Sequence, residues 1–252
     1  MRERSAMLGM SRGTTERGPE HLLMAHPRRD SAFTVVVVAL TALLLAAVAN
    51  PSAMAHIQRL DDAWLELMAS NRTAALTALA LVLNVLGLVW VTLPIRIGIA
   101  GFLALSRRWW HLAAFVATVV MSEILIGTLK DLYDRTRAPG SLVETSGASF
   151  PSGHAIAASA TVVAAVIALV PPGRRRAAWG AGAVVFSLLM ALSRAYLGAH
   201  WLSDAVAGVF LGTSCALVAC LGVGAIQSWS ERRTAAQDGS GASSVALPKE
   251  RL

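Results

Sequence analysis

Cysteine is scarce in this sequence: there are only two, Cys215 and Cys220, and both lie in one apolar stretch near the C-terminus. Two thiols in one apolar block exclude a disulfide framework and a zinc site. Carboxylates are also few, with 15 Asp and Glu in all, and they form no cluster along the chain that would suit a metal ion. We therefore expect no metal site.

Charge is sparse as well, because only 15 % of the 252 residues are charged, whereas 55 % are apolar and the mean hydropathy is +0.58. The apolar residues come in blocks of about 20, the length that a helix needs to cross a bilayer. The net charge of +7 comes from arginines in short clusters between these blocks, not along one stripe. This pattern is typical of membrane topology signals, and it does not favour a nucleic-acid partner.

The blocks predict an all-α, polytopic membrane bundle with six transmembrane helices. The expected crossings are Phe33–Ala49, Leu86–Leu105, His111–Leu129, Ala155–Val170, Ala178–Ser193 and Ser203–Val223. Residues 1–30 are expected to be a flexible cytoplasmic tail, 31–226 the six-helix membrane domain, and 227–252 a disordered cytoplasmic tail. Ala53-Met54-Ala55 resembles a signal-peptidase site, so cleavage of the first apolar segment is an alternative.

The stretch after the first crossing is ambiguous. It is apolar from Thr73 onward and too long for one helix, but Arg96 and Arg107 are only about eleven residues apart, or ~16 Å of helix. A second crossing does not fit there. We expect a surface helix near Asp61–Leu83 instead.

Orientation follows from the arginines, since basic short loops stay in the cytoplasm. The ends that carry Arg28, Arg107 and Arg174–Arg176 fall on one side of the six-crossing arrangement. Both termini are then cytoplasmic, the protein lies in the cell membrane, and the opposite loops face outside.

The most informative stretch is Ser193–Asp204, which ends in His200-Trp-Leu-Ser-Asp204. Residues four apart lie on one helix face, so the carboxylate can accept a hydrogen bond from one imidazole nitrogen and leave the other free to react. Arg194 adds a planar cation, which suits a substrate that carries a phosphate.

Two further stretches point to the same chemistry. Pro151-Ser152-Gly153-His154 precedes an apolar run, so its backbone N–H groups begin a helix, where anions bind readily. Lys130 and Arg137 follow an earlier apolar run and add two cations at the same membrane face.

Together the three stretches resemble the signature of the type 2 phosphatidic acid phosphatase family, which also includes vanadium haloperoxidases. Its pattern is Lys-x6-Arg-Pro, then Pro-Ser-Gly-His, then Ser-Arg-x5-His-x3-Asp. The resemblance covers roughly residues 60 to 224, and the second and third stretches match at every motif position. The first departs once, because Ala138 stands where the family has proline and Pro139 follows. Arg135 is therefore an alternative to Arg137, although the spacing from Lys130 favours Arg137.

The resemblance implies an integral-membrane phosphatase that acts on a lipid phosphomonoester or pyrophosphate without a metal or other cofactor. Phosphatidic acid, phosphatidylglycerophosphate and polyprenyl pyrophosphate are equally compatible with the motifs. It implies that His200 attacks phosphorus and becomes a phosphohistidine, that Asp204 orients it, and that His154 protonates the leaving oxygen. By the same resemblance the phosphate ligands are Lys130, Arg137, Ser152, Gly153 and Arg194.

Two alternatives stay open at this point. A lipid phosphotransferase would use the same phosphohistidine, and a membrane transporter would use Arg96 and Glu123 as a relay. Each of these two residues falls within an apolar stretch, where an unpaired charge is costly, so we expect them to form an ion pair. The transporter leaves the three motifs unexplained. The oligomeric state stays open.

Overall fold

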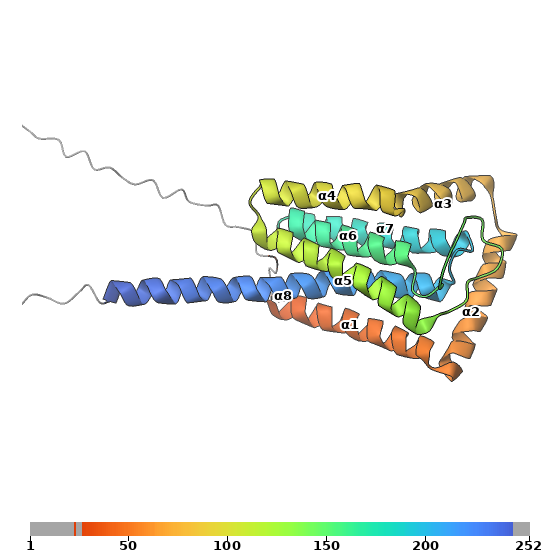
Figure 1. Cartoon of the computed structure of the whole chain (residues 1–252), viewed down its shortest axis with the longest axis horizontal. Coiled ribbons are helices and arrows are strands. Elements are labelled where there is room, and N and C mark those ends of the chain that lie inside the picture. The colour runs from red at the N-terminus through yellow and green to blue at the C-terminus, as the bar shows by residue number, and fades with distance from the viewer. Residues whose placement is uncertain (1–22, 24–26, 244–252) are drawn as a thin grey trace, which may run out of the picture.

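The computed structural model describes Leu23 and residues 27–243, and every regular element within them is a helix. The helices are α1 (Pro27–Ala49), α2 (Pro51–Ser70), α3 (Ala74–Leu86), α4 (Val89–Leu105), α5 (Trp109–Tyr133), α6 (Gly153–Leu169), α7 (Arg174–Tyr196) and α8 (Leu202–Ser243). Figure 1 shows a bundle of roughly aligned helices with α2 lying across one end. Most of the predicted N-terminal tail falls outside the described residues.

Apolar helices make this a multi-pass membrane protein. Within the described residues, α1, α5, α7 and α8 are each long and apolar enough to cross a bilayer. Helices α3 and α4 pass the same test only as a pair, bent by 54°. The 17-residue α6 is shorter. The all-α membrane bundle is thus confirmed, with four or five crossings by length and composition.

The region between α1 and α4 differs from the sequence-based prediction. A surface helix over Asp61–Leu83 is wrong, because α2 ends at Ser70 and a new helix starts after Thr73, whose side chain accepts a hydrogen bond of 3.2 Å from the Leu76 N–H. A threonine that satisfies a first-turn N–H in this way begins a helix. The surface helix is therefore α2, and α3 joins α4 at a bend around Gly87 and Leu88.

Helix α6 lies at the centre of the bundle, packed against α5, α7 and α8. Small residues allow this close packing. A Cβ at Gly212 of α8 would overlap the Ser159 hydroxyl of α6 and stand 2.9 Å from the Ala160 nitrogen. Because α6 is enclosed by protein, it needs small residues for helix contact more than length for lipid contact.

The predicted ion pair inside the bundle is confirmed. Nη1 of Arg96 on α4 lies 2.6 Å from Glu123 on α5, and its Nε donates to the Thr161 hydroxyl on α6 at 2.9 Å. The pair ties α4 to its two neighbours.

Helix α8 continues to Ser243, past the predicted end at Val223, and projects beyond the bundle in Figure 1. The predicted disordered tail is therefore helical up to residue 243, and residues 244–252 lie outside the described ones. No proline occurs between Val223 and Ser243, and residues 231–237 include good helix formers such as Ala235 and Ala236, so the helix can continue past Val223.

Candidate active site

The three motifs meet at the end of the bundle that α2 crosses (Figure 1). One comes from the end of α5 and the loop after it, one from the start of α6, and one from the end of α7 and the turn into α8. The Leu142 N–H donates to the Leu197 carbonyl at 2.8 Å and joins the two loops. Gly198 has φ +66, and a Cβ there would stand 3.4 Å from the Gly140 oxygen, so only glycine allows this approach without strain.

His200 lies in the turn between α7 and α8 and is 3 % exposed. Its Nδ1 is 2.7 Å from the Ser149 carbonyl oxygen. A carbonyl only accepts, so Nδ1 carries the proton and Nε2 keeps its lone pair. Asp204 was expected to orient the ring directly, but its Oδ2 is 3.8 Å from Nδ1. The Ser149 carbonyl therefore sets the tautomer, and Asp204 acts on the ring through charge.

Asp204, in the first turn of α8, is fully buried, and both carboxylate oxygens accept hydrogen bonds. Arg135 Nη1 donates to Oδ1 at 2.5 Å, while the Ser149 hydroxyl and the Trp201 N–H donate to Oδ2 at 2.5 and 3.1 Å. Ser149 thus joins the two residues, since its hydroxyl holds Asp204 and its carbonyl holds His200. Sequence reasoning missed Ser149, because a serine just before a motif has no distinctive pattern.

Two cations of the first motif, Lys130 and Arg137, have no carboxylate partner in the described hydrogen bonds and ion pairs. Lys130 Nζ and Arg137 Nη2 both donate to the Ala148 carbonyl, at 2.9 and 3.2 Å. Arg137 Nη1 lies 3.5 Å from His200 Nε2, the ring nitrogen that keeps its lone pair. Arg135, the alternative, is held between the carboxylates of Asp204 and Asp61, whereas Arg137 lies beside Nε2 of His200.

His154 and Arg194 come from the first turn of α6 and the last turn of α7. The Arg194 guanidinium donates to the side-chain oxygen of Asn84. Gly87 packs against the His154 ring, where a Cβ would overlap Cδ2. The bend between α3 and α4 therefore shapes the site, and neither Asn84 nor Gly87 was identified as a site residue from the sequence.

Both histidines are in environments that disfavour the imidazolium form. Burial lowers the pKa of His200, with Arg194 and Arg137 adding to the effect and Asp204 opposing it. His154 precedes the predicted crossing 155–170, and burial, followed by the charge of Arg194, lowers its pKa to about 3. With no ligand bound, both rings are neutral near pH 7.

Ser152 and Gly153, predicted as phosphate ligands, lie at the start of α6. The Ser152 N–H donates to the Asp204 backbone carbonyl at 3.1 Å, so this amide is not available to an anion. Its buried hydroxyl has no hydrogen-bond partner in the described structure. A Cβ at Gly153 would meet only Ile126 at 3.9 Å, which is an ordinary contact, so protein packing does not require glycine there.

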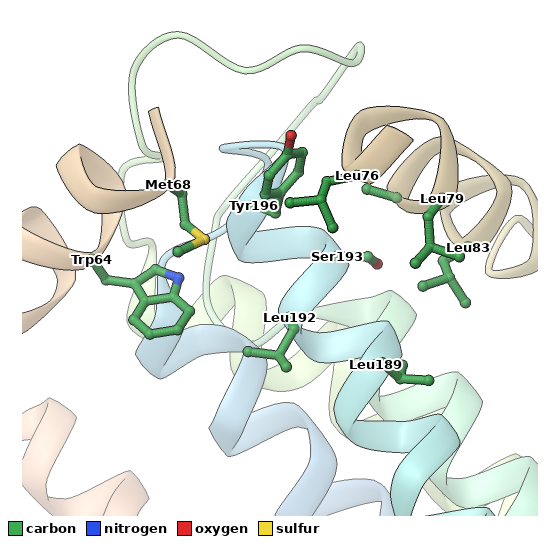
Figure 2. A pocket seen from close by; sticks show the side chains of 10 residues that line it. Trp64, Met68, Leu76, Leu79, Leu83, Leu189, Leu192, Ser193 and Tyr196 are labelled. Carbon is green, nitrogen blue, oxygen red and sulfur yellow. The ribbon is translucent and has the colours of Figure 1, made fainter. Parts of the chain in front are cut away.

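An apolar cavity of about 300 Å³ borders this site, between α2, α3 and α7. Figure 2 shows Trp64 and Met68 of α2, Leu79 of α3 and Leu192 of α7 around it. Ser193, which directly precedes Arg194, also lines it. One residue that lines the cavity is thus the chain neighbour of a candidate phosphate ligand. Across Leu23 and residues 27–243, no three His, Cys, Asp or Glu side chains are grouped so that they could hold a metal ion.

Comparison with known proteins finds a family model that matches part of the chain and solved structures with a similar fold. Residues 108–227 match the family model of the PAP2 superfamily, and this region contains all three motifs. No curated protein gave a significant match. The matched region begins after α4, so α1 to α4 lie outside it.

Two solved structures resemble this fold. One is the first transmembrane PAP2-type phosphatidylglycerolphosphate phosphatase from Bacillus subtilis, with a TM-score of 0.66 and 23 % identity over 79 % of this chain and 96 % of that chain. The other is LpxE from Aquifex aeolicus, with a TM-score of 0.51 and 20 % identity over 62 % of this chain and 91 % of that chain.

Proposed function

We propose that this chain, whose residues 108–227 match the family model of the PAP2 superfamily, is a hydrolase that removes phosphate from a lipid at the outer membrane face through a phosphohistidine. One observation carries the proposal. His200 Nδ1 is bound by the Ser149 carbonyl, and Nε2 faces Arg137, a cation with no carboxylate partner in the described contacts. A nucleophilic nitrogen beside such a cation suits attack on a phosphate.

In the first step, His200 Nε2 attacks phosphorus, and the bond from phosphorus to the leaving oxygen breaks. Lys130, Arg137 and Arg194 bind the three equatorial oxygens as charge builds up on them. His154 gives its proton to the leaving oxygen. In the second step, water attacks the phosphohistidine, His154 accepts a proton from that water, and phosphate leaves with His200 restored.

His154 is neutral in the empty site, so the acid must be formed on binding. A phosphate dianion beside the ring favours the imidazolium form and so opposes the effects of burial and of Arg194 on the His154 pKa. The substrate therefore supplies the charge that makes His154 an acid.

The apolar cavity supports a lipid as the substrate. Its lining is almost wholly hydrocarbon, which suits a lipid chain, and it includes Ser193, the residue before Arg194 in the chain. The Bacillus subtilis structure is named a phosphatidylglycerolphosphate phosphatase, which makes that lipid a candidate beside phosphatidic acid and polyprenyl pyrophosphate.

Topology completes the proposal. If α1, the bent pair α3 and α4, and α5 to α8 each cross once, there are six crossings, and the motif loops share the end opposite Arg107 and Arg174–Arg176. Basic loops mark the cytoplasmic side, so the site faces outside and both termini are cytoplasmic in the cell membrane.

The test is release of inorganic phosphate by purified protein from phosphatidic acid, phosphatidylglycerophosphate and a polyprenyl pyrophosphate. We expect activity on at least one of these lipids and near-complete loss of that activity in His200→Ala. The matched control His56→Ala, whose ring is exposed on α2, should keep full activity. Acid-labile labelling of the protein by a ³²P-lipid should disappear in His200→Ala. No release from any of the lipids, or an active His200→Ala, would contradict the proposal.

A further inference from the structure

Asp61 is a buried carboxylate on the surface helix α2. It is 2 % exposed, although its neighbours Asp62 and Ala63 are exposed. It accepts from the Ser203 N–H at 2.8 Å and from the Ser203 hydroxyl at 2.6 Å. An unpaired carboxylate at this depth would be very costly, so its position depends on these partners and on a cation.

That cation is Arg135, whose side chain is 9 % exposed. Its Nη2 donates to Asp61 Oδ2 at 2.8 Å, and its Nη1 donates to Asp204 Oδ1 at 2.5 Å. The two arms of one rigid guanidinium therefore hold two carboxylates, one from α2 and one beside the nucleophile. Lysine could not do this, because its ammonium is a point charge without a fork.

The contacts continue to the reacting atom. Asp204 Oδ2 accepts from the Ser149 hydroxyl, and the Ser149 carbonyl binds His200 Nδ1. Asp61 holds the Nη2 end of the Arg135 guanidinium, so that only Nη1 is left to bind Asp204, and it binds Oδ1. Without Asp61, one arm of a buried guanidinium loses its charged partner, and Asp204 alone balances its charge.

We propose that Asp61 is a positioning residue for catalysis, which acts through Arg135 and Asp204 to hold His200 in its attacking orientation. The proposal rests on the proposed function, and it extends the active site to α2, outside the matched residues 108–227. Asp61 touches neither His200 nor the candidate phosphate ligands in the described hydrogen bonds and ion pairs. Its loss should therefore slow the chemical step and leave phosphate binding alone.

The main variant is Asp61→Asn, which keeps the shape and an acceptor for Ser203 but removes the charge that holds Arg135. Its matched control is Glu66→Gln, an exposed carboxylate on the same helix. We expect kcat of Asp61→Asn to fall by roughly 10²-fold, the effect of misplacing a reacting group by about 1 Å, with KM unchanged. The factor should be equal for a lipid phosphate and p-nitrophenyl phosphate, because the defect is in the nucleophile and not in the leaving group.

A second variant, Arg135→Lys, keeps the charge but cannot hold both carboxylates, and it should lower kcat in the same way. Asp61→Asn should add nothing in the Arg135→Lys background, because one connection is already broken. If Asp61→Asn is not recovered as folded protein, Arg135→Lys alone decides.

Unchanged kcat in the folded variants would overturn the inference, even with a lower unfolding temperature. A rise in KM with no change in kcat would also overturn it. So would a double variant, Asp61→Asn with Arg135→Lys, whose loss of kcat equals the product of the two single losses. Phosphate release by wild type and by Glu66→Gln tests the proposed function separately from the role of Asp61. If neither releases phosphate from any lipid, the lipid substrate is wrong, while p-nitrophenyl phosphate still tests Asp61.

Discussion

Gly87 gives the most direct test of the role of His154. It ends α3 with φ −87, which alanine adopts freely, so Gly87→Ala changes the space beside His154 and not the backbone. The added Cβ would overlap Cδ2 of the ring and lie 3.0 Å from its Cγ, against 3.4 Å for an ordinary contact. Cγ must retreat by at least 0.4 Å and Cδ2 by more, so we expect the ring to move by about 1 Å.

A shift of about 1 Å at a reacting group can cost ~10²-fold in rate, and a positioned acid contributes ~10² to 10⁴-fold in all. We therefore expect Gly87→Ala to lower kcat on a lipid phosphate by ~10²-fold. p-Nitrophenyl phosphate has a leaving group that needs little protonation, so it should lose much less. His154→Ala should show the same contrast, and adding Gly87→Ala to it should change nothing further.

Purified Gly87→Ala and wild type should be assayed side by side on both substrates. Gly98→Ala is the matched control, because it lies in α4 with no atom within 4 Å of the added Cβ. Equal losses on the two substrates would show that His154 does not act on the leaving group. If Gly87→Ala cleaved the lipid phosphate as fast as wild type, the position of the His154 ring would not be critical.

Three further predictions follow from the charges. Because the pKa of His200 is lowered from its ordinary value of about 6.5, the ring stays neutral at somewhat lower pH than a free histidine. The acid limb of kcat/KM, corrected for titration of the substrate, should therefore lie below pH 6.5, and a limb above pH 6.5 would contradict this. Replacing Arg96 or Glu123 alone by an apolar residue should lower the unfolding temperature, and the double replacement should recover part of the loss; additive losses would show that the two act separately. A cysteine at Gly147 should react with an impermeant thiol reagent from outside and one at Gly173 should not, and the reverse labelling would overturn the orientation.

The sequence predicted the helical membrane bundle well, for a local reason. Apolar blocks are defined by neighbouring residues, and each motif lies at a block end, so loops on one side bring the motifs together. The α2–α3 region failed because Thr73 lies within a continuous pattern, and a single capping threonine decides where the helix begins.

The partners of the motif residues could not be read from the sequence. Asp61 looks like any carboxylate on an amphipathic helix, and its burial depends on Arg135, 74 residues away. The same contact explains why spacing alone left Arg135 and Arg137 unresolved. One is neutralised by carboxylates and the other is not, and only the folded chain distinguishes them.

The hydrogen bonds of Lys130 and Arg137 have a kinetic consequence. Both cations are held by neutral carbonyl oxygens, such as that of Ala148, and thus keep their charge while their geometry is fixed. Uncompensated charge at the mouth of a site attracts anions over about a Debye length, which is ~8 Å at physiological ionic strength. Capture of a phosphate dianion should therefore slow as salt rises, while the rate of the bound complex stays the same. In a membrane rich in anionic lipids, the same field would also draw lipids that the enzyme cannot cleave, so the composition of the surrounding leaflet would govern how often the site is free.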